Sequence, residues 1–212
     1  MNAVVRRTGT AATETYRTAA RQWTTGVALL TAQDGDAVFA KTVSSLCTLS
    51  LEPLLVSVAV DRRSPLTAAV RTSRRYALSV LSREQEGLAR RFAAPGTGRA
   101  FGFFTGLPTR YGETGAPLLE ECLSWFDCRL HHVLPAGDHV LLVGRVVAAD
   151  GGSGDPLLYH DGAFHSIDER GVRTQAREPR DAREPRDTRD IDDPRGTRDA
   201  RDRPTTTTGA ST

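Results

Sequence analysis

Short runs of alternating apolar and polar residues, separated by turn signals, fill most of the chain between residues 13 and 168. Period-2 alternation with many β-branched residues is typical of strands rather than helices. Turns such as Asp34-Gly35 join neighbouring segments, which is typical of antiparallel hairpins. The spacing therefore predicts a mainly β fold, a closed antiparallel barrel with two or three peripheral helices. The predicted strands lie at 27–31, 37–42, 54–60, 76–81, 121–133, 138–149, 156–159 and 163–167.

Three segments carry helix signals instead. Ser64 and Pro65 suit the N-cap and the first turn of a helix. Ser82 and Gln85 have the spacing of a capping box. The glycine-rich stretch 93–115 has neither pattern and is predicted to be a long loop. The expected helices are 13–23, 65–71 and 83–92.

The stretch from Phe39 to Val60 combines a core pattern with small hydroxyl residues. We interpret it as a strand, a turn at Glu52-Pro53 and a second, almost wholly apolar strand, because Pro53 excludes a helix through the turn. A buried hydroxyl needs a partner, which is either neighbouring backbone or a polar ligand. One cation among hydroxyl and backbone N–H donors is also what a phosphate site requires, so both alternatives stay open. The polar members are Lys41, Thr42, Ser44, Ser45, Thr48 and Ser50.

The composition changes at residue 169. The sequence AREPRD occurs twice, at 176–181 and 182–187, and apolar residues are nearly absent beyond it. Burial then cannot offset the entropy of ordering. We expect one folded domain at 13–168, flanked by disordered segments at 1–12 and 169–212.

Charge and cysteine content narrow the class of protein. The 212 residues carry a formal net charge of +2, which gives nucleic-acid binding no support. No apolar run is long enough to span a membrane, and the N-terminal segment lacks the apolar core of a signal peptide. An odd count of three cysteines without a CxxC pair argues against disulfides and for a reducing cytoplasm.

The common signatures of nucleotide, metal and hydrolase sites, such as GxGxxG and HExxH, are absent. His131 and His132 are neighbours in a predicted strand, so their side chains are expected on opposite faces and no metal site is expected there. His139 follows Gly137-Asp138 at the start of a strand, as either a surface turn residue or a ligand contact.

The chain contains, in this order, the segments TGVALLT, KTVSSLCTLSLEPLLVSVAV, YALSVLSREQEGLARRFA, GDHVLLVGRV and PLLYHDGAFH. Together they resemble the flavin reductase family, the FMN-binding split barrels that serve two-component monooxygenases. The resemblance spans roughly residues 14–167. Ala40 and Lys41 stand where the family usually has glycine and an apolar residue. The resemblance implies a split antiparallel barrel that binds FMN or FAD, with NADH or NADPH as the hydride donor.

The resemblance also implies roles for particular residues. Hydride passes from nicotinamide C4 to flavin N5, so the protein must stack two rings rather than supply an acid or a nucleophile. His139 is expected to lie near the docking place of the nicotinamide as a positioning and polarising hydrogen-bond donor. The expected flavin contacts are Lys41, Thr42, Val43, Ser44 and Ser45 at the ring edge and phosphate arm, Cys47 at the ring face, and Ser64 and Arg91 at the phosphate.

Reduced flavin is then expected to diffuse to a partner monooxygenase, and the resemblance implies a homodimer with flavin sites near its interface. A second interpretation keeps FMN tightly bound and acts directly on an organic substrate. A third is a barrel that holds flavin or haem without turnover. FMN and FAD, and NADH and NADPH, stay open as alternatives.

Overall fold

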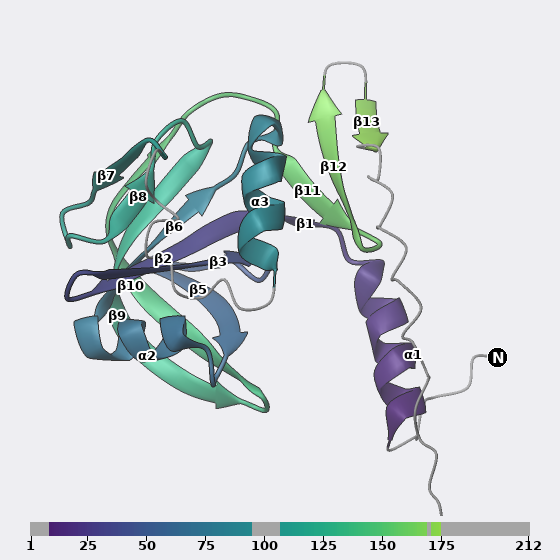
Figure 1. Cartoon of the computed structure of the whole chain (residues 1–212), viewed down its shortest axis with the longest axis horizontal. Helices are drawn as coiled ribbons and strands as arrows, with labels where there is room; N and C mark the ends of the chain where they lie inside the picture. Colours follow the sequence, from purple (N-terminus) through teal and green to yellow (C-terminus); the bar gives the residue numbers. More distant parts are fainter. Residues whose placement is uncertain (1–8, 95–106, 169–170, 175–212) are drawn as a thin grey trace, which may run out of the picture. The chain divides into compact units, whose positions relative to one another are not determined.

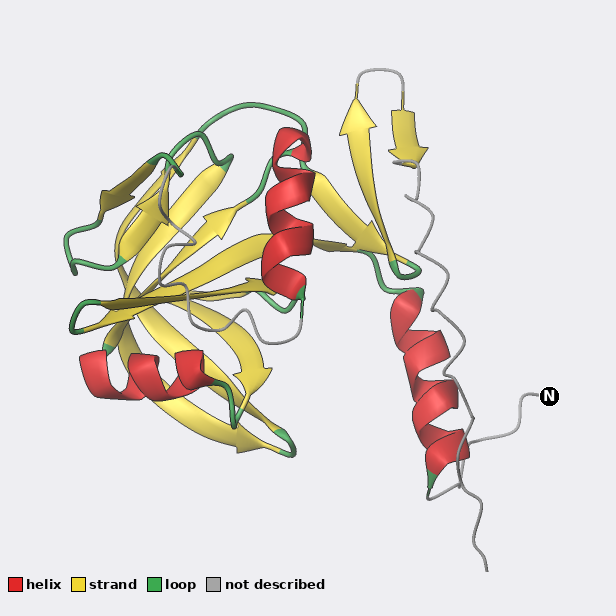
Figure 2. Cartoon of the chain, viewed as in Figure 1, coloured by secondary structure: helices red, strands yellow, loops and turns green. Residues whose placement is uncertain are grey.

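The computed structural model describes residues 9–94, 107–168 and 171–174 (Figure 1). Strands predominate, with three α-helices and one 3₁₀ turn in this part of the chain (Figure 2), so the predicted mainly β fold is confirmed. The elements are α1 (Thr10–Arg21), β1 (Thr25–Gly26), β2 (Ala28–Asp34), β3 (Ala37–Val43), β4 (Cys47–Leu51), β5 (Leu54–Asp61), α2 (Pro65–Ser73), β6 (Arg75–Val80), η1 (Arg83–Gln85), α3 (Glu86–Ala93), β7 (Thr109–Tyr111), β8 (Pro117–Leu119), β9 (Ser124–Ala136), β10 (His139–Gly151), β11 (Leu157–His160), β12 (Ala163–Asp168) and β13 (Gly171–Thr174).

A seven-stranded antiparallel sheet with the order β3-β2-β6-β9-β10-β5-β4 forms the centre of the fold. The turn of its longest hairpin, β9–β10, contains Gly137, which has a φ of 68°. Glycine adopts such a positive φ without the steric cost that a side chain would bring. A second sheet, β1-β11-β12-β13, contains the small hairpin expected near the end of the domain.

The central sheet is not closed by hydrogen bonds between its edge strands, β3 and β4, in the described part of the chain. These two strands are consecutive, and residues 44–46 connect them. The gap between the edges therefore lies beside a segment that the sequence marks as rich in hydroxyl groups. The closed barrel that the strand spacing predicts is therefore not completed by hydrogen bonds among the described strands.

The two faces of β2 show how the alternating pattern divides the core. Leu30 packs in one buried cluster with Leu66 and Val70 of α2. Leu29, its neighbour, packs in another cluster with Phe92 of α3. Successive side chains of a strand point to opposite faces of the sheet. One strand can therefore pack against α2 on one face and against α3 on the other.

Several predicted boundaries differ from the structure. The first helix begins at Thr10 rather than Thr13, and the predicted loop 93–115 contains strand β7, which pairs with β8 just after that loop. Strand β13 lies at the start of the segment predicted to be disordered and extends the second sheet through pairing with β12. The remaining predicted tail, 175–212, and the first eight residues lie outside the described residues.

The start of α2 and the helical turn before α3 agree with the sequence signals. Ser82 and Gln85 form the expected capping box, although the first turn is 3₁₀ before α3 begins. Ser64 is the N-cap of α2, with Pro65 in the first turn, but its side chain makes no capping hydrogen bond. No helix in the described ranges is both long and apolar enough to cross a membrane.

Tyr76 is a buried residue whose hydroxyl has no hydrogen-bond partner among the described residues. Burial raises the pKa of this phenol far above its usual range. Gly144 leaves the space that the hydroxyl fills, because a Cβ there would lie 2.2 Å from the hydroxyl oxygen. A hydroxyl that is buried without a hydrogen bond destabilises the folded state, because the hydrogen bonds it made to water are lost and not replaced.

We therefore expect Tyr76→Phe to raise the free energy of unfolding by about 1 kcal/mol. Urea unfolding followed by circular dichroism measures this change. Tyr111→Phe, at an exposed tyrosine, is the matched control and should change stability by less than about 0.5 kcal/mol. A clear loss of stability in Tyr76→Phe would contradict an unpaired hydroxyl.

Candidate functional site

A groove of about 280 Å³ lies beside the opening of the central sheet. One wall is the end of β3 with the segment that follows it, and the other is the end of β5 with the first residue of β10. The register pairs His139 with Asp61, which brings the start of β10 to this groove. The structure thus brings together six of the nine predicted site residues, which are Lys41, Thr42, Val43, Ser44, Ser45 and His139.

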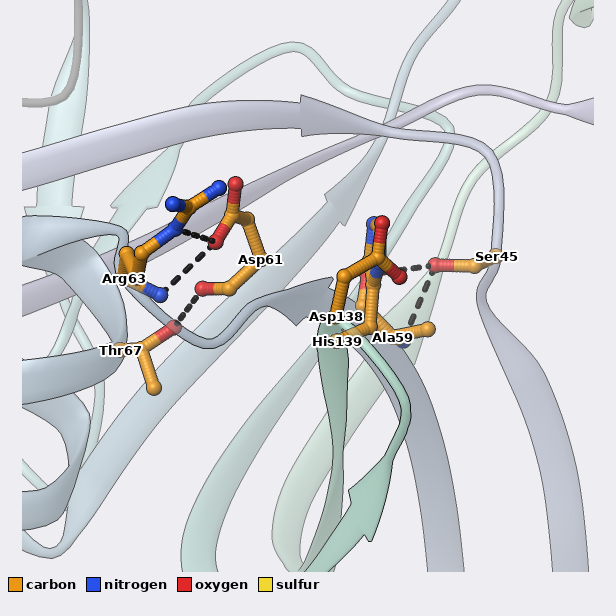
Figure 3. A network of polar contacts seen from close by, with 7 residues as sticks. All are labelled: Ser45, Ala59, Asp61, Arg63, Thr67, Asp138 and His139. Carbon is orange, nitrogen blue, oxygen red and sulfur yellow. Dashed lines mark hydrogen bonds and ion pairs between the residues drawn. The ribbon is translucent and has the colours of Figure 1, made fainter. Parts of the chain in front are cut away.

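The hydroxyl groups of the groove have different partners. The Thr42 hydroxyl donates to the carbonyl of Ala89 in α3 at 2.8 Å. The Ser45 hydroxyl donates to the carbonyl of Ala59 and accepts from its N–H, both at 3.0 Å (Figure 3). Ser44 is exposed. Neighbouring backbone is therefore the partner of two of these side chains, the first of the two alternatives that the sequence left open.

Ser45 replaces a missing strand partner on β5. Strand β4 pairs with β5 from Leu51 back to Cys47, which lies opposite Ser57. Two residues further along β5, the N–H and C=O of Ala59 face the same edge, where β4 has ended. The Ser45 hydroxyl occupies both groups and ties the 44–46 segment to β5 across the opening of the sheet.

We expect Ser45→Ala to lower the free energy of unfolding by about 1–2 kcal/mol, because it leaves two backbone groups of Ala59 without a partner. Ser44→Ala removes the neighbouring exposed hydroxyl and should cost less than about 0.5 kcal/mol. Thermal unfolding of both variants gives the comparison. Equal stability of the two variants would contradict the bridging role of Ser45.

The backbone of the 44–46 segment offers donors as well. No hydrogen bond from the N–H groups of Ser44, Ser45 or Leu46 to another backbone group is found within the described ranges. Consecutive unpaired N–H groups form a concave site for anions and for carbonyl oxygens. This segment can therefore donate to a ligand while the Ser45 side chain holds it in place.

Lys41 is the only lysine of the chain, and it is half-buried on β3 at the groove. No ion pair of Lys41 with a carboxylate is found in the part of the chain that the structure describes. A cation placed among unpaired N–H donors makes this wall of the groove electropositive. It suits a ligand with a phosphate or an electron-rich ring edge.

His139 is held by the residue before it. Its Nδ1 lies 2.8 Å from Oδ1 of Asp138, and this hydrogen bond holds the pKa of the Asp138 carboxyl below its usual range. A carboxylate only accepts, so Nδ1–H is the donor and Nε2 of the neutral ring is left as an acceptor. Figure 3 shows both residues near Ser45 and Ala59. The neutral ring can thus accept a hydrogen bond from an amide group in the groove, whereas the resemblance implied that His139 donates one.

The turn between β5 and α2 adds a carboxylate that the sequence analysis did not single out. Asp61 lines the groove, and its carboxylate accepts from the N–H of Arg63 at 2.8 Å (Figure 3). Its carbonyl accepts from the Thr67 hydroxyl at 2.8 Å and from the N–H of Ser64 at 3.0 Å. The sequence DRRSP could have predicted this turn, because an acidic residue precedes the Ser-Pro pair that begins a helix.

Three predicted residues lie outside the lining of the groove. Ser64 is next to it in the turn after Asp61. Arg91 is exposed on α3, with its guanidinium 5.7 Å from the ring centre of Phe92. Cys47 is exposed and lines a neighbouring pocket of about 620 Å³. These three residues are therefore not brought into the lining of the groove.

One prediction about histidines is wrong. The rings of His131 and His132 lie 4.2 Å apart between centres and are both exposed, rather than on opposite faces. The register shifts between Val143 and Gly144, so His131 has no partner on β10. Such a bulge re-aims side chains and breaks the alternation. Among the described residues, no group of three or more metal-ligating side chains forms.

Comparison with known proteins identifies the family of this chain. Residues 20–168 match the family model described as flavin reductase like domain. An NADPH-flavin oxidoreductase of Streptomyces viridifaciens is 39% identical over 160 residues, which cover 74% of this chain and 82% of that protein. The NADH-dependent FMN reductase SmoA of Agrobacterium fabrum is 35% identical and covers 70% of this chain and 83% of its own.

Solved structures are similar as well. The flavin reductase component of a bacterial two-component tryptophan halogenase has a TM-score of 0.68 at 31% identity, and the match covers 73% of this chain and 97% of that one. The styrene monooxygenase flavin reductase of Pseudomonas putida S12 has a TM-score of 0.63 at 26% identity, with coverage of 71% and 96%. The chain therefore belongs to the flavin reductase-like domain family.

Proposed function

We propose that this protein is an NAD(P)H-dependent flavin reductase that transfers hydride to FMN or FAD. The observation that carries the proposal is the groove that Lys41, Ser44, Ser45 and His139 line together, beside a segment whose N–H groups donate to no other backbone group in the described ranges. Relatives that are named NADPH-flavin oxidoreductase and NADH-dependent FMN reductase support the same activity. The flavin supplies an electron-accepting ring, and the reaction needs no acid or nucleophile from the protein.

The residues of the groove then have distinct tasks. Lys41 and the N–H groups of the 44–46 segment bind the edge of the flavin ring and its phosphate arm, with Thr42 and Val43 forming the adjoining wall. Cys47 borders the ring face, and Ser64 and Arg91 contact the phosphate. His139 accepts a hydrogen bond from the carboxamide of the nicotinamide through Nε2, and so orients that ring against the flavin.

Reduced flavin serves a second protein in this proposal. A relative in Rhodococcus opacus is named the reductase component of a nitrophenol monooxygenase, and the similar structures include reductase components of two-component systems. A groove that is open to solvent allows the reduced flavin to leave. We infer a flavin-dependent monooxygenase as the recipient, reached by diffusion of the flavin.

The deciding experiment is a spectrum of the purified protein followed by oxidation of NADH and of NADPH with added FMN and FAD. Steady oxidation that depends on added flavin supports the proposal. Stoichiometric flavin that stays with the protein supports instead a flavoprotein acting directly on an organic substrate. Absence of flavin binding, with haem retained, supports a barrel without turnover and refutes the proposal.

We also propose a homodimer in the cytoplasm. Three exposed leucines on the β4–β5 hairpin, Leu49, Leu51 and Leu54, offer an apolar surface for a second copy, and Leu51 is 88% exposed. The three cysteines are free, as a reducing compartment implies.

Leu51→Asp is expected to shift the protein to monomers in sedimentation velocity, because a charge would be buried in the proposed interface. Leu134→Asp, at another exposed leucine, is the matched control and should leave the mass unchanged. A dimer that persists in Leu51→Asp would place the interface elsewhere.

A further inference from the structure

Three arginines lie side by side across the middle of the central sheet. The register places Arg129 of β9 opposite Arg75 of β6 on one side and opposite Arg145 of β10 on the other. Residues directly opposite each other in neighbouring strands point to the same face, so the three side chains form one line. We call these three residues the arginine row. None of them lines the groove beside the opening of the sheet.

The arginine row points away from the buried core. Arg129 and Arg145 are exposed, whereas Cys128, which precedes Arg129, is buried. Successive side chains of a strand point to opposite faces, so the arginines lie on the outer face of the sheet. Arg75 is half-buried at one end of the row, where its Nη1 donates to the carbonyl of Thr114 at 2.7 Å. The turn between β7 and β8 thus holds this end of the row in place.

The arginine row has no carboxylate to neutralise it. No member of the row takes part in an ion pair within the described ranges. Asp127, two residues before Arg129, is buried, and its carboxylate accepts from the N–H and the hydroxyl of Thr114. Like charges directly opposite each other in a sheet destabilise the fold. The described part of the chain therefore does not offset the repulsion within the row.

A row of carboxylates on another molecule would offset this repulsion. The guanidinium group presents a planar fork of donors that matches a carboxylate in two hydrogen bonds. Neighbouring strands lie about 4.8 Å apart, so the row extends over about 10 Å. Carboxylates at positions i, i+4 and i+7 share one face of a helix and extend over about 10.5 Å. Three residues on one face of a strand extend over about 13 Å. The spacing therefore favours a helix.

We propose that the arginine row docks an acidic helix of a partner protein through carboxylates on one face of that helix. DNA is a poorer match, because binding to its many phosphates requires a broadly basic protein and this chain has a formal net charge of only +2. A second copy of the chain would bring the same three cations to a symmetric contact. Docking of this kind is fast, reversible and sensitive to salt. It does not depend on the proposed function, because the row and the groove share no residue.

The test measures fluorescence anisotropy of a labelled, alanine-rich helical peptide with glutamates at i, i+4 and i+7, titrated with the full-length protein at low salt. Arg129→Glu places a carboxylate between the two flanking arginines and should weaken peptide binding about tenfold. Arg21→Glu is the matched control, because it makes the same change in net charge at an exposed arginine outside the row. It should change the affinity less than about twofold.

Two further comparisons separate the arginine row from general attraction between opposite charges. A peptide of the same composition, with its glutamates on three different faces of the helix, should bind about fivefold more weakly. Arg129→Lys keeps the charge without the fork and should lose only about twofold. The melting temperature of Arg129→Glu should exceed that of the unchanged protein at low salt, because repulsion within the row is replaced by attraction. This gain should disappear at high salt.

Four results would overturn the inference. The first is no binding of the acidic peptide by the unchanged protein at low salt. The second is an equal loss of affinity in Arg129→Glu and Arg21→Glu, since net charge alone would then explain it. The third is equal affinity for the two peptides. The fourth is tighter binding of duplex DNA or of anionic lipid vesicles that is lost in Arg129→Glu, which would assign the row to a nucleic acid or a membrane.

Discussion

His139→Ala is expected to slow the reduction of flavin by NAD(P)H about 10- to 100-fold, while the dissociation constant for FMN changes less than about twofold. The ring is fixed at Nδ1 by Asp138 at 2.8 Å, which leaves Nε2 to orient the nicotinamide. Hydride transfer depends steeply on the alignment of donor and acceptor, whereas flavin binding depends mainly on the opposite wall of the groove. Anaerobic stopped-flow absorbance measures the rate, and fluorescence titration measures FMN binding.

His132→Ala is the matched control, because His132 is an exposed histidine further along the same hairpin and outside the groove. It should leave both quantities unchanged. If His139→Ala reduces flavin as fast as the unchanged protein, the role of His139 is refuted. If the variant loses FMN binding and rate together, His139 contacts the flavin rather than the nicotinamide.

Lys41→Met is expected to weaken FMN binding about 10- to 100-fold, because hydrogen bonds to a charged group contribute about 1.5–3 kcal/mol. Methionine keeps the length of the apolar stem, so packing against β3 is largely preserved. Lys41→Arg keeps the charge and should lose less affinity. Fluorescence titration at fixed ionic strength gives the three dissociation constants.

Titration with riboflavin, which lacks the phosphate, separates two sources of the loss in Lys41→Met. If Lys41 pairs with the phosphate, riboflavin binds the two proteins equally. If Lys41 binds the ring edge, the substitution weakens the binding of riboflavin as much as the binding of FMN. Unchanged affinity for both ligands would remove Lys41 from the site.

Much of this fold follows from local patterns. The apolar and β-branched runs at 27–31 and 37–42 predicted a pair of strands, which β2 and β3 form, and Ser82 with Gln85 marked the start of a helical turn. These features depend on residues a few positions apart. A local pattern therefore contains enough information to specify them.

The site depends on register, which a local pattern does not contain. The partner of the Ser45 hydroxyl is Ala59, and that contact exists because β4 ends before it reaches this position on β5. The alternation rule also fails at His131, where a bulge beside Gly144 interrupts the β9–β10 ladder. Residues remote in sequence decide both outcomes, so the sequence left two alternatives for the hydroxyl groups and gave the wrong faces for the histidines.

The anchor formed by Ser45 has a consequence for turnover. Because its hydroxyl already engages Ala59, the donors of the 44–46 segment are fixed before any ligand arrives. Flavin binding therefore costs little entropy for ordering this segment, and the segment does not have to unfold when the flavin leaves. A flavin reductase that binds oxidised flavin and releases reduced flavin in every turnover benefits from such a preformed binding segment. The rate of flavin release then depends on the strength of the contacts between flavin and protein.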